Sequence, residues 1–550
     1  MKRLRVLLND INKTVEVDYG TSCDLIAKDN GIKGDFIGAI INNEVNSINT
    51  PLEVNSSVSF ITARDSRGME IYRRSLSFLL LKVVSDNFPG RKIVIGHSLG
   101  NSYYFDISGG ILTEADVEFI KKKMKDDVDA DLPIERDKVS YEEAIKNFKD
   151  AERDDKLKLL ESFNMPALNI YKCDDFWKIN DGPIVSSTGV LKTYDIKLYP
   201  PGFLLVMPDK DDPYKVAPPK DNNKIFQVYR EYKEWGNALK VNNVGSLNTI
   251  IKNGEIYNFI QVNEALHTKK IINISNDIYN RKDTIRLISI AGPSSSGKTT
   301  FGKRLSIDLQ AHGFKPLMIS LDNYFVNRVS TPLDSEGKPD YENIEALNIE
   351  LLNEQLEALL KGKKVKLPSY NFFTGVSSFS DKETELKDDE VILIEGIHGL
   401  NDRLTYIIPH ENKFKIYISA LTQMNIDDNT RIPTTDNRII RRMVRDYKYR
   451  GHSAQKTLQM WTSVRRGEEK WIFPYQNNAD AYFNSALDYE LGILKLFAEP
   501  ILQQIKPDEP EYGESIRLLR FLRYFLNIQP GKVPPNSILR EFIGDSSFHY

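Results

Sequence analysis

The C-terminal half of the sequence predicts an α/β fold in which a parallel sheet is covered by helices. From Arg286 onward, short apolar runs alternate with glycine-containing turns and helical patterns, and this rhythm repeats. Strands are expected at 287–291, 316–320, 391–396 and 413–420, and helices at 300–313 and 349–362. Alternation of this kind requires crossover connections, which place helices on both faces of a parallel sheet.

The N-terminal half follows a different pattern. Residues 1–64 contain short alternating strands around a brief helix at 22–29 and predict a β-grasp domain. Residues 65–254 mix helices and strands and predict an α+β domain. A helical linker at 255–284 then leads to the α/β domain at 285–495, and a helical extension occupies 496–550.

Bulk composition limits the class of protein. A chain of 550 residues is too long for one core and predicts several domains. Its formal net charge of -3 gives no global attraction to nucleic acid or anionic membrane. The two cysteines, Cys23 and Cys173, cannot build a disulfide framework or a cysteine zinc site. With no apolar stretch long enough to span a membrane and no signal peptide pattern, we expect a cytoplasmic protein.

The strongest motif is a glycine-rich loop between the first predicted strand and helix of the α/β domain. Residues 292–299 read GPSSSGKT and match the G-x-x-x-x-G-K-[ST] pattern in the required context. Such a loop turns its N–H groups toward phosphates, and the helix adds its positive dipole end. The motif predicts ATP binding by Gly292, Ser294, Ser295, Ser296, Gly297, Lys298, Thr299 and Thr300, with Lys298 on the phosphates and Thr299 on Mg²⁺.

Two acidic residues at strand ends are candidates for the chemistry of phosphoryl transfer. Asp322 follows the strand at 316–320, where a carboxylate can accept the proton of an attacking hydroxyl and help hold the metal. Glu395 ends the apolar strand 391–394 and is placed to hold Mg²⁺ directly or through water. Taken singly, Asp322 also fits an Asx-turn and Glu395 a capping residue, so the neighbouring loop decides between these interpretations.

A basic segment follows the sheet. Arg438, Arg441, Arg442 and Arg445 recur at three- and four-residue spacing, mostly on one helical side. Such arginines on a mobile lid close over phosphates and stabilise the charge in transfer. The alternative interpretation is a solvated basic helix face, which is the commoner meaning of this pattern.

Together, the loop, the S-x-D-x-[YF] strand end, LPSYNF, the IEG strand and RRMVRDYKYRG resemble the uridine/cytidine kinase family over roughly 286–490. The resemblance implies that Asp322 is the base for a ribose 5′-hydroxyl and that Glu395 assists the metal. It also implies catalytic roles for Lys298, Arg445 and Arg450. The implied substrate contacts are Asp322, Tyr324, Glu342, Tyr370, Phe372 and Arg442.

Two departures from that family leave the acceptor open. The position of its pyrimidine-reading histidine falls on Gly375, and that of its second lid arginine falls on His452. A pocket that hydrogen-bonds its substrate discriminates strongly, so losing the histidine changes which base is accepted. A nucleoside kinase of the salvage type, acting on uridine or cytidine, is therefore the first hypothesis. A purine nucleoside or a sugar phosphate is the alternative acceptor.

The N-terminal half resembles the TGS domain and second additional domain of threonyl-tRNA synthetase. The segments are TARDSRGMEIYRRSLSFLLLKVV, IGHSLGNSYYFDI and the stretch through NDGPIVSS. The editing histidine positions of that family fall on Arg74 and Phe78, and its later pair falls on Asn180 and Ile184. The resemblance therefore implies neither editing nor, without the synthetase core, aminoacylation. His97 has no cluster of partners and is expected to be structural.

The sequence leaves several binding partners possible. The N-terminal half either binds RNA, a nucleotide or another subunit, or only supports the kinase. A nucleotide-binding regulator that associates with RNA or the ribosome is the alternative from a different functional class. The helix predicted near 515–528 has leucines and phenylalanines at core spacing, which fits packing on the kinase or in a homo-oligomer.

Overall fold

The computed structural model describes residues 2–163, 165–179, 182–216, 218–219, 223–334, 336–387 and 389–549. The chain forms two compact units. Unit 1 comprises Met1–Lys252, Gln423–Ile432 and Glu499–Leu526, and unit 2 comprises Asn253–Thr422, Pro433–Ala498 and Asn527–Tyr550. Among the described residues, none of the helices is both long and apolar enough to cross a membrane.

Unit 1 begins with a five-stranded sheet in the order β2-β1-β5-β3-β4 and one helix, α1 (Cys23–Asp29). Its strands are β1 (Arg3–Leu8), β2 (Lys13–Asp18), β3 (Phe36–Ile41), β4 (Glu44–Ser47) and β5 (Ser56–Thr62). Along β1 the side chains alternate strictly between exposed and buried, so Leu4, Val6 and Leu8 enter the core. Ser22 caps α1 by accepting a hydrogen bond from the Leu25 amide. This mixed sheet with one helix is the predicted β-grasp arrangement.

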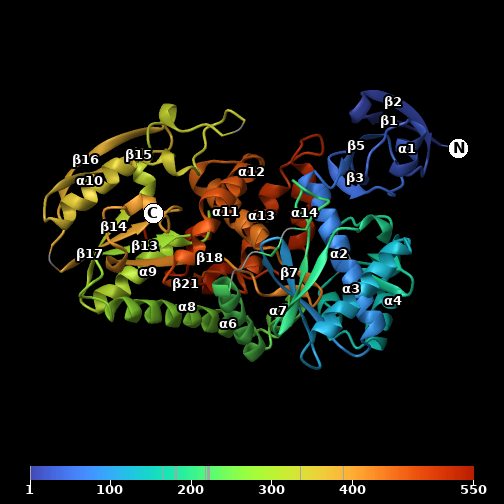
Figure 1. Ribbon diagram of the computed structural model, residues 1–550, viewed down its shortest axis with the longest axis horizontal. Coiled ribbons are helices and arrows are strands. Elements are labelled where there is room, and N and C mark those ends of the chain that lie inside the picture. The colour runs from blue at the N-terminus through green and yellow to red at the C-terminus, as the bar shows by residue number, and fades with distance from the viewer. Residues whose placement is uncertain are drawn as a thin grey trace. The chain divides into compact units, whose positions relative to one another are not determined.

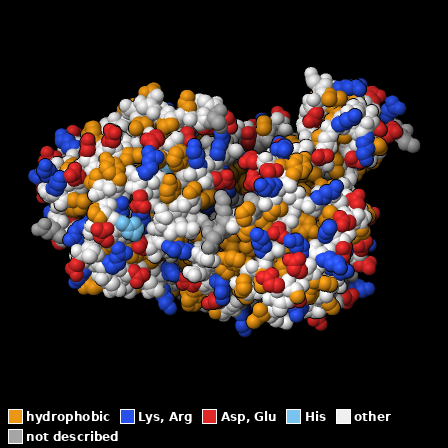
Figure 2. Space-filling view, in the orientation of Figure 1, with side chains coloured by type: hydrophobic (Ala, Val, Ile, Leu, Met, Phe, Trp, Pro, Cys, Tyr) orange, Lys and Arg blue, Asp and Glu red, His pale blue; other side chains and the backbone are white. Residues whose placement is uncertain are grey.

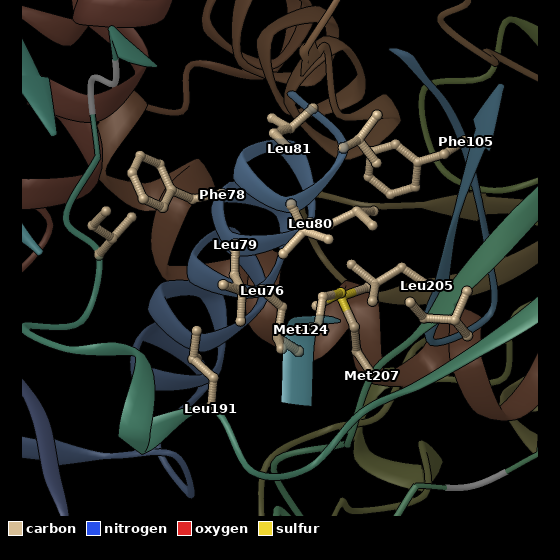
Figure 3. Close-up of a cluster of buried hydrophobic side chains, with 14 of the residues drawn as sticks. Leu76, Phe78, Leu79, Leu80, Leu81, Phe105, Met124, Leu191, Leu205 and Met207 are labelled. Carbon is tan, nitrogen blue, oxygen red and sulfur yellow. The ribbon is translucent and has the colours of Figure 1, made fainter. Parts of the chain in front are cut away.

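The largest apolar cluster in the rest of unit 1 forms around the long helix α2 (Ser66–Asn87) (Figure 3). Asp65 begins α2 as its N-cap. Two antiparallel sheets have the orders β11-β12-β7-β6 and β10-β9-β8. The strands are β6 (Ile93–Leu99), β7 (Ser102–Ile107), β8 (Glu135–Ser140), β9 (Ala167–Cys173), β10 (Phe176–Ile179), β11 (Asp195–Tyr199) and β12 (Gly202–Val206). The other helices are α3 (Glu114–Asp129), α4 (Tyr141–Asp150), α5 (Asp154–Leu160), α6 (Asn223–Leu239), α7 (Val244–Lys252) and α14 (Tyr512–Leu522).

A hairpin of β19 (Asn425–Asp427) and β20 (Thr430–Arg431) also belongs to unit 1, although its sequence lies inside the stretch expected to be catalytic. Asp427 forms a buried ion pair with Lys156, with 2.8 Å between Nζ and Oδ2. The Asn425 side chain donates to the Ile95 carbonyl at 2.7 Å. These polar contacts reach across hundreds of residues, so they have no local sequence signal.

Unit 2 is built on a five-stranded parallel sheet in the order β14-β17-β13-β18-β21 (Figure 1). The strands are β13 (Leu287–Ala291), β14 (Lys315–Ser320), β17 (Glu390–Glu395), β18 (Lys413–Ser419) and β21 (Ala481–Asn484). A separate hairpin joins β15 (Val365–Asn371) to β16 (Val376–Thr384). The central strand β13 and its neighbour β18 are buried along their whole length, as expected for a sheet covered on both faces.

Helices cover both faces of that sheet. Helix α9 (Lys298–Ala311) contacts β13, β14 and β17, while α10 (Ile349–Leu360) packs its leucines with sheet residues in a second cluster. The segment expected to be a linker is the helix α8 (Ile256–Tyr279), which packs against α9. The remaining helices are α11 (Thr434–Arg450), α12 (Ala454–Trp471), α13 (Glu490–Leu502) and α15 (Arg540–Ile543). On the face shown in Figure 2, basic and acidic side chains are interspersed.

Candidate active site

The glycine-rich loop joins the buried strand β13 to α9 and has the backbone that phosphate binding requires. A Cβ on Gly292 would lie 2.1 Å from the Ile418 carbonyl oxygen, so only glycine fits there. Ser295 and Gly297 have positive φ values of 59° and 81°, which curl the loop before the first turn of α9. The N–H groups at the start of α9 have no carbonyl within the helix to bond, so the loop and helix together form an anion site.

Lys298 is half-buried at the end of this loop. Its Nζ donates to the Pro293 carbonyl at 3.2 Å. Burial lowers the pKa of Lys298, and the carboxylates of Glu395, Asp322 and Glu541 act against that shift. An arriving phosphate would add to this negative charge and favour the protonated lysine.

Glu395 ends β17 beside the loop. Its Oε1 accepts from the Ser320 hydroxyl at 3.0 Å, and its Oε2 lies 3.5 Å from the Thr299 hydroxyl. Burial and the nearby Asp322 carboxylate raise the pKa of Glu395 to about 7, while Lys298 opposes the shift. Two carboxylates and a hydroxyl are hard oxygen donors that suit Mg²⁺. Mg²⁺ is usually bound by one or two carboxylates together with substrate phosphates, so phosphates would complete its coordination here.

Asp322 lies in the short 3₁₀ turn Leu321–Tyr324 that directly follows β14. In the parallel register Ser320 pairs with Glu395, which brings the ends of both strands to the same edge of the sheet. Asp322 itself is exposed, whereas Tyr324 is only 1% exposed and its hydroxyl donates to Gln355 at 2.7 Å. The structure thus leaves Asp322 exposed after the end of β14 and buries Tyr324 in the core.

Glu342 is the third acidic group near the loop. Burial, with the carboxylate of Glu468, raises the pKa of Glu342 to about 7, and Arg442 and Lys298 oppose the shift. Its Oε2 is shielded from solvent and has no hydrogen-bond partner among the described residues. A shielded oxygen without a partner is costly, so it is a candidate contact for a substrate hydroxyl.

The aromatic residues expected on the acceptor side lie together. The rings of Tyr370 and Phe372 are 5.0 Å apart, and Phe325 lies within 5.9 Å of both. Tyr370 is buried, whereas Phe372 is 55% exposed. Tyr370 lies in β15, Phe372 directly follows that strand and Phe325 follows the turn after β14, so the three rings form one aromatic wall.

Arg328 occupies the space beside Gly375, and sequence reasoning did not find it. Gly375 has a φ of 73°, and a Cβ there would lie 2.7 Å from Arg328 side-chain atoms. The Arg328 guanidinium donates to the Phe372 carbonyl at 2.6 Å. A guanidinium therefore stands next to the position that the family resemblance gives to histidine. The sequence offered no signal for this contact, because an arginine in a loop is ordinary.

Two of the arginines in the basic segment are buried supports of the loop and not exposed lid residues. Arg438 forms an ion pair with Glu468 and donates from Nε to the Ser294 carbonyl at 2.9 Å. Arg441 pairs with Glu490 at 2.6 Å and donates to the Ser295 carbonyl at 3.3 Å. Neither the mobile-lid interpretation nor the solvated-face interpretation describes these two residues. Glu468 also accepts from the Ser294 amide at 3.1 Å.

The other three arginines converge on Asp446, which is fully buried. Arg442, Arg445 and Arg450 lie 3.2, 3.5 and 3.3 Å from its carboxylate oxygens. Arg442 also donates to the Ser294 hydroxyl at 2.8 Å, which places it beside the loop. Arg450 has a side chain that is 45% exposed. The structure thus groups the predicted arginines around one carboxylate, and the sequence analysis did not identify that carboxylate.

In the N-terminal half, the residues at the editing positions support the fold. The Arg74 guanidinium donates to the Pro183 carbonyl at 2.7 Å, and Phe78 packs on Phe176 within the apolar cluster (Figure 3). Ile184 is fully buried in the same cluster, and Asn180 lies outside the described residues. None of the three described side chains can act as a nucleophile or a zinc ligand.

The surroundings of His97 fit a structural role. It is buried on β6 and stacks on Tyr229 with ring centroids 5.8 Å apart. Burial and the nearby Arg431 lower the pKa of His97 to about 3, so the imidazole is neutral. The cysteines Cys23 and Cys173 are free and buried, and burial raises the pKa of both thiols.

A parallel sheet with a phosphate loop after its central strand, a lysine in that loop and acidic residues at the neighbouring strand ends defines a P-loop kinase. Residues 287–491 match the model of the phosphoribulokinase / uridine kinase family. A uridine kinase from Ligilactobacillus salivarius is 33% identical over 202 residues, which cover 36% of this chain and 85% of that protein. The chain belongs to the phosphoribulokinase/uridine kinase family.

The N-terminal half matches another group of proteins. The threonine–tRNA ligase of Thermotoga neapolitana is 34% identical over 198 residues, covering 35% of this chain and 30% of the ligase. The ligase of Rubrobacter xylanophilus is 29% identical over 188 residues, covering 34% of this chain and 29% of that ligase. The chain thus spans about 30% of the length of these ligases. This agrees with the resemblance seen in the sequence.

Proposed function

We propose that this protein transfers the γ-phosphoryl group of ATP to the 5′-hydroxyl of a nucleoside, with uridine or cytidine as the first candidates. The observation that carries the proposal is the position of Asp322. It is an exposed carboxylate at the end of β14, close enough to Glu395 and Lys298 to shift their pKa values. A base beside the phosphate loop serves an acceptor hydroxyl and has no use in a nucleotide switch.

In this proposal the loop amides and Lys298 bind the phosphates of ATP. Asp322 accepts the proton of the acceptor hydroxyl as the oxygen attacks the γ-phosphorus, and ADP leaves from the opposite side. Thr299, Asp322 and Glu395 would hold Mg²⁺, which supplies charge neutralisation on the phosphates when it is bound. Arg442, Arg445 and Arg450 add positive charge near the loop, and Glu342 receives the ribose hydroxyls.

A second acceptor class is favoured by one observation, the guanidinium of Arg328 beside Gly375. Arginine carries five N–H donors and no acceptor, whereas a neutral histidine offers one of each. A pocket with Arg328 therefore suits carbonyl or phosphate oxygens, as in a purine base such as guanine or a sugar phosphate. The acceptor hydroxyl and Asp322 keep the same roles in this alternative.

The test is ADP release from the full-length protein with Mg-ATP, alone and with each common nucleoside and a panel of sugar phosphates. Stimulation by uridine or cytidine that is lost in Lys298→Ala and in Asp322→Asn would support the first proposal. Stimulation by guanosine or a sugar phosphate alone would keep the kinase and replace the acceptor. ATP binding without any acceptor-dependent turnover would refute phosphoryl transfer to these acceptors.

A further inference from the structure

The C-terminal segment of unit 2, residues 527–549, packs tightly around the phosphate loop. It contains α15 (Arg540–Ile543), and Ile538, Leu539, Phe542 and Ile543 are all buried. A Cβ on Gly297 would lie 2.5 Å from the Ile538 side chain, so this residue touches the loop itself. Phe542 lies under the guanidinium of Arg441, 5.0 Å from the ring centroid. The segment is therefore part of the wall of the site.

One side chain of this segment, Glu541, reaches the phosphate-binding end of α9. Its Oε2 accepts from the Thr300 hydroxyl at 2.7 Å and lies 3.3 Å from the Thr300 amide nitrogen. Its Oε1 lies 3.5 Å from Arg445 Nη1. Glu541 is only 7% exposed, so these charge-assisted contacts are shielded from water.

The groups that Glu541 contacts are those expected to bind an anion. The Thr300 amide is the third of the N–H groups at the start of α9, directly after Lys298 and Thr299. The first four amides of a helix have no partner within it, and the helix dipole favours negative charge there. A carboxylate at this place thus occupies a position that a nucleotide phosphate needs.

We propose that Glu541 is an internal competitor of the nucleotide: its carboxylate occupies the Thr300 and Arg445 donors, and a nucleotide phosphate displaces it. The inference rests on the proposed binding of ATP to this loop. Displacement needs only a change of the Glu541 rotamer, because the neighbouring Ile538 and Phe542 anchor the backbone. When the carboxylate leaves, Arg445 loses one of its two anionic partners and becomes available to the phosphates.

This arrangement would make nucleotide affinity depend on Glu541 in a direction opposite to that of an ordinary binding residue. A residue that helps to hold ATP or its metal weakens binding when it is removed. Removing a competitor strengthens ATP binding instead, because the nucleotide-free protein loses contacts that the nucleotide-bound protein does not have. The variant Glu541→Gln keeps the size of the side chain and removes the charge that pairs with Arg445.

The experiment measures the Kd of mant-ATP for full-length wild type, Glu541→Gln and Glu541→Ala, in Mg²⁺ and in EDTA, without an acceptor. We expect both variants to bind about tenfold more tightly than wild type in both buffers. Asp545→Asn is the matched control, since it removes an exposed carboxylate from the same segment and should leave the Kd unchanged. Far-ultraviolet circular dichroism checks that all variants are folded.

An unchanged or weaker affinity in both Glu541 variants would overturn the inference. Weakening confined to Mg²⁺ would overturn it too, because Glu541 would then belong to the metal site. The measurements distinguish a wrong role for Glu541 from a wrong proposal of kinase activity. If acceptor-dependent ADP release occurs while Glu541→Gln binds ATP no more tightly, only the competitor role is wrong. If neither wild type nor Glu541→Gln binds mant-ATP, both are wrong.

Discussion

Arg441 and Glu490 form an ion pair beneath the phosphate loop, with 2.6 Å between Nη2 and Oε2 and side chains that are 0% and 2% exposed. Arg441 uses its remaining donors on the Ser295 carbonyl and on the hydroxyl and carbonyl of Ser485. A guanidinium at the centre of such a network fixes the loop backbone, because each of its N–H groups has a fixed direction. The shape of the phosphate loop therefore depends on Glu490 as well as on the loop sequence.

Removing one member of this pair should destabilise the protein strongly. Glu490→Ala leaves Arg441 buried without its anion, and we expect a loss of about 3–5 kcal/mol in the free energy of unfolding of unit 2. Urea denaturation followed by circular dichroism would measure it. Glu514→Ala breaks an exposed pair with Arg517 and should cost less than about 1 kcal/mol. Equal losses in the two variants would contradict the structural role of the buried pair.

The raised pKa of Glu342 should make the free energy of unfolding depend on pH. Its pKa is about 7 in the folded protein against an ordinary 4.5, so the folded state holds a proton that the unfolded state releases between these values. Stability from this group is therefore present below pH 4.5 and is lost as pH rises through 7. The shift corresponds to roughly 3 kcal/mol, at about 1.4 kcal/mol per pKa unit.

The measurement is urea denaturation of wild type and Glu342→Gln at pH 5, 6, 7 and 8, without Mg²⁺ or nucleotide. The free energy of unfolding of wild type should fall relative to that of the variant as pH rises. Glu350→Gln, which changes an exposed carboxyl on α10, should follow wild type at every pH. A constant difference between wild type and Glu342→Gln would show that Glu342 is ionised throughout.

Arg328 should contribute to the affinity for the acceptor. In Arg328→Ala the guanidinium beside Phe372 and Gly375 is lost, so we expect KM for the preferred acceptor to rise about tenfold while KM for ATP is unchanged. Steady-state ADP release with the acceptor found in the panel would measure both. Arg403→Ala removes an exposed arginine paired with Glu345 and serves as the control. An unchanged KM for the acceptor in Arg328→Ala would mean that the acceptor does not contact this arginine.

The strands around the phosphate loop were predictable because local sequence sets them. The apolar runs 287–291 and 391–394 are each followed within two residues by glycine, and the structure confirms them as β13 and β17. The glycine-rich loop lies where the motif placed it, because its conformation needs only a few residues in order. Helix 349–362 was predicted within two residues of α10. Local patterns were sufficient for these elements.

The supporting carboxylates were not predictable, since each pairs with a residue far along the chain. Glu468 and Glu490 read as ordinary surface acids in helical segments, yet they are buried against Arg438 and Arg441. Glu541 lies in a terminal segment without any motif. Periodicity identifies which side of a helix is basic, but whether that side meets solvent depends on the tertiary fold.

The apolar core of unit 1 predicts that the editing positions cannot be restored singly. Phe78 is 2% exposed and packs against Phe176, so Phe78→His would leave a cavity and a buried polar ring. We expect a loss of about 2–4 kcal/mol in the free energy of unfolding of unit 1. Phe119→His, at a ring that is 41% exposed on α3, should cost much less. A fully stable Phe78→His would mean that the cluster repacks.

Substitution of Asp446 should impair catalysis although this residue is not expected to contact the phosphates. Its buried carboxylate lies within 3.5 Å of Arg442, Arg445 and Arg450, so Asp446→Asn leaves three like charges without their common anion. Repulsion should spread these guanidinium groups, and we expect kcat to fall at least tenfold, with a smaller change in KM for ATP. Steady-state kinetics would separate the two constants.

The control for Asp446 is Glu469→Gln, which neutralises an exposed carboxylate paired with Arg465 on α12. It should leave kcat and KM unchanged, because the arginines near the loop keep their partner. If Asp446→Asn instead raised only the KM for ATP, the three arginines would act in nucleotide binding alone. If it lowered kcat in a variant that circular dichroism shows to be folded, the carboxylate would be a positioning residue that holds the arginines in the geometry that phosphoryl transfer requires.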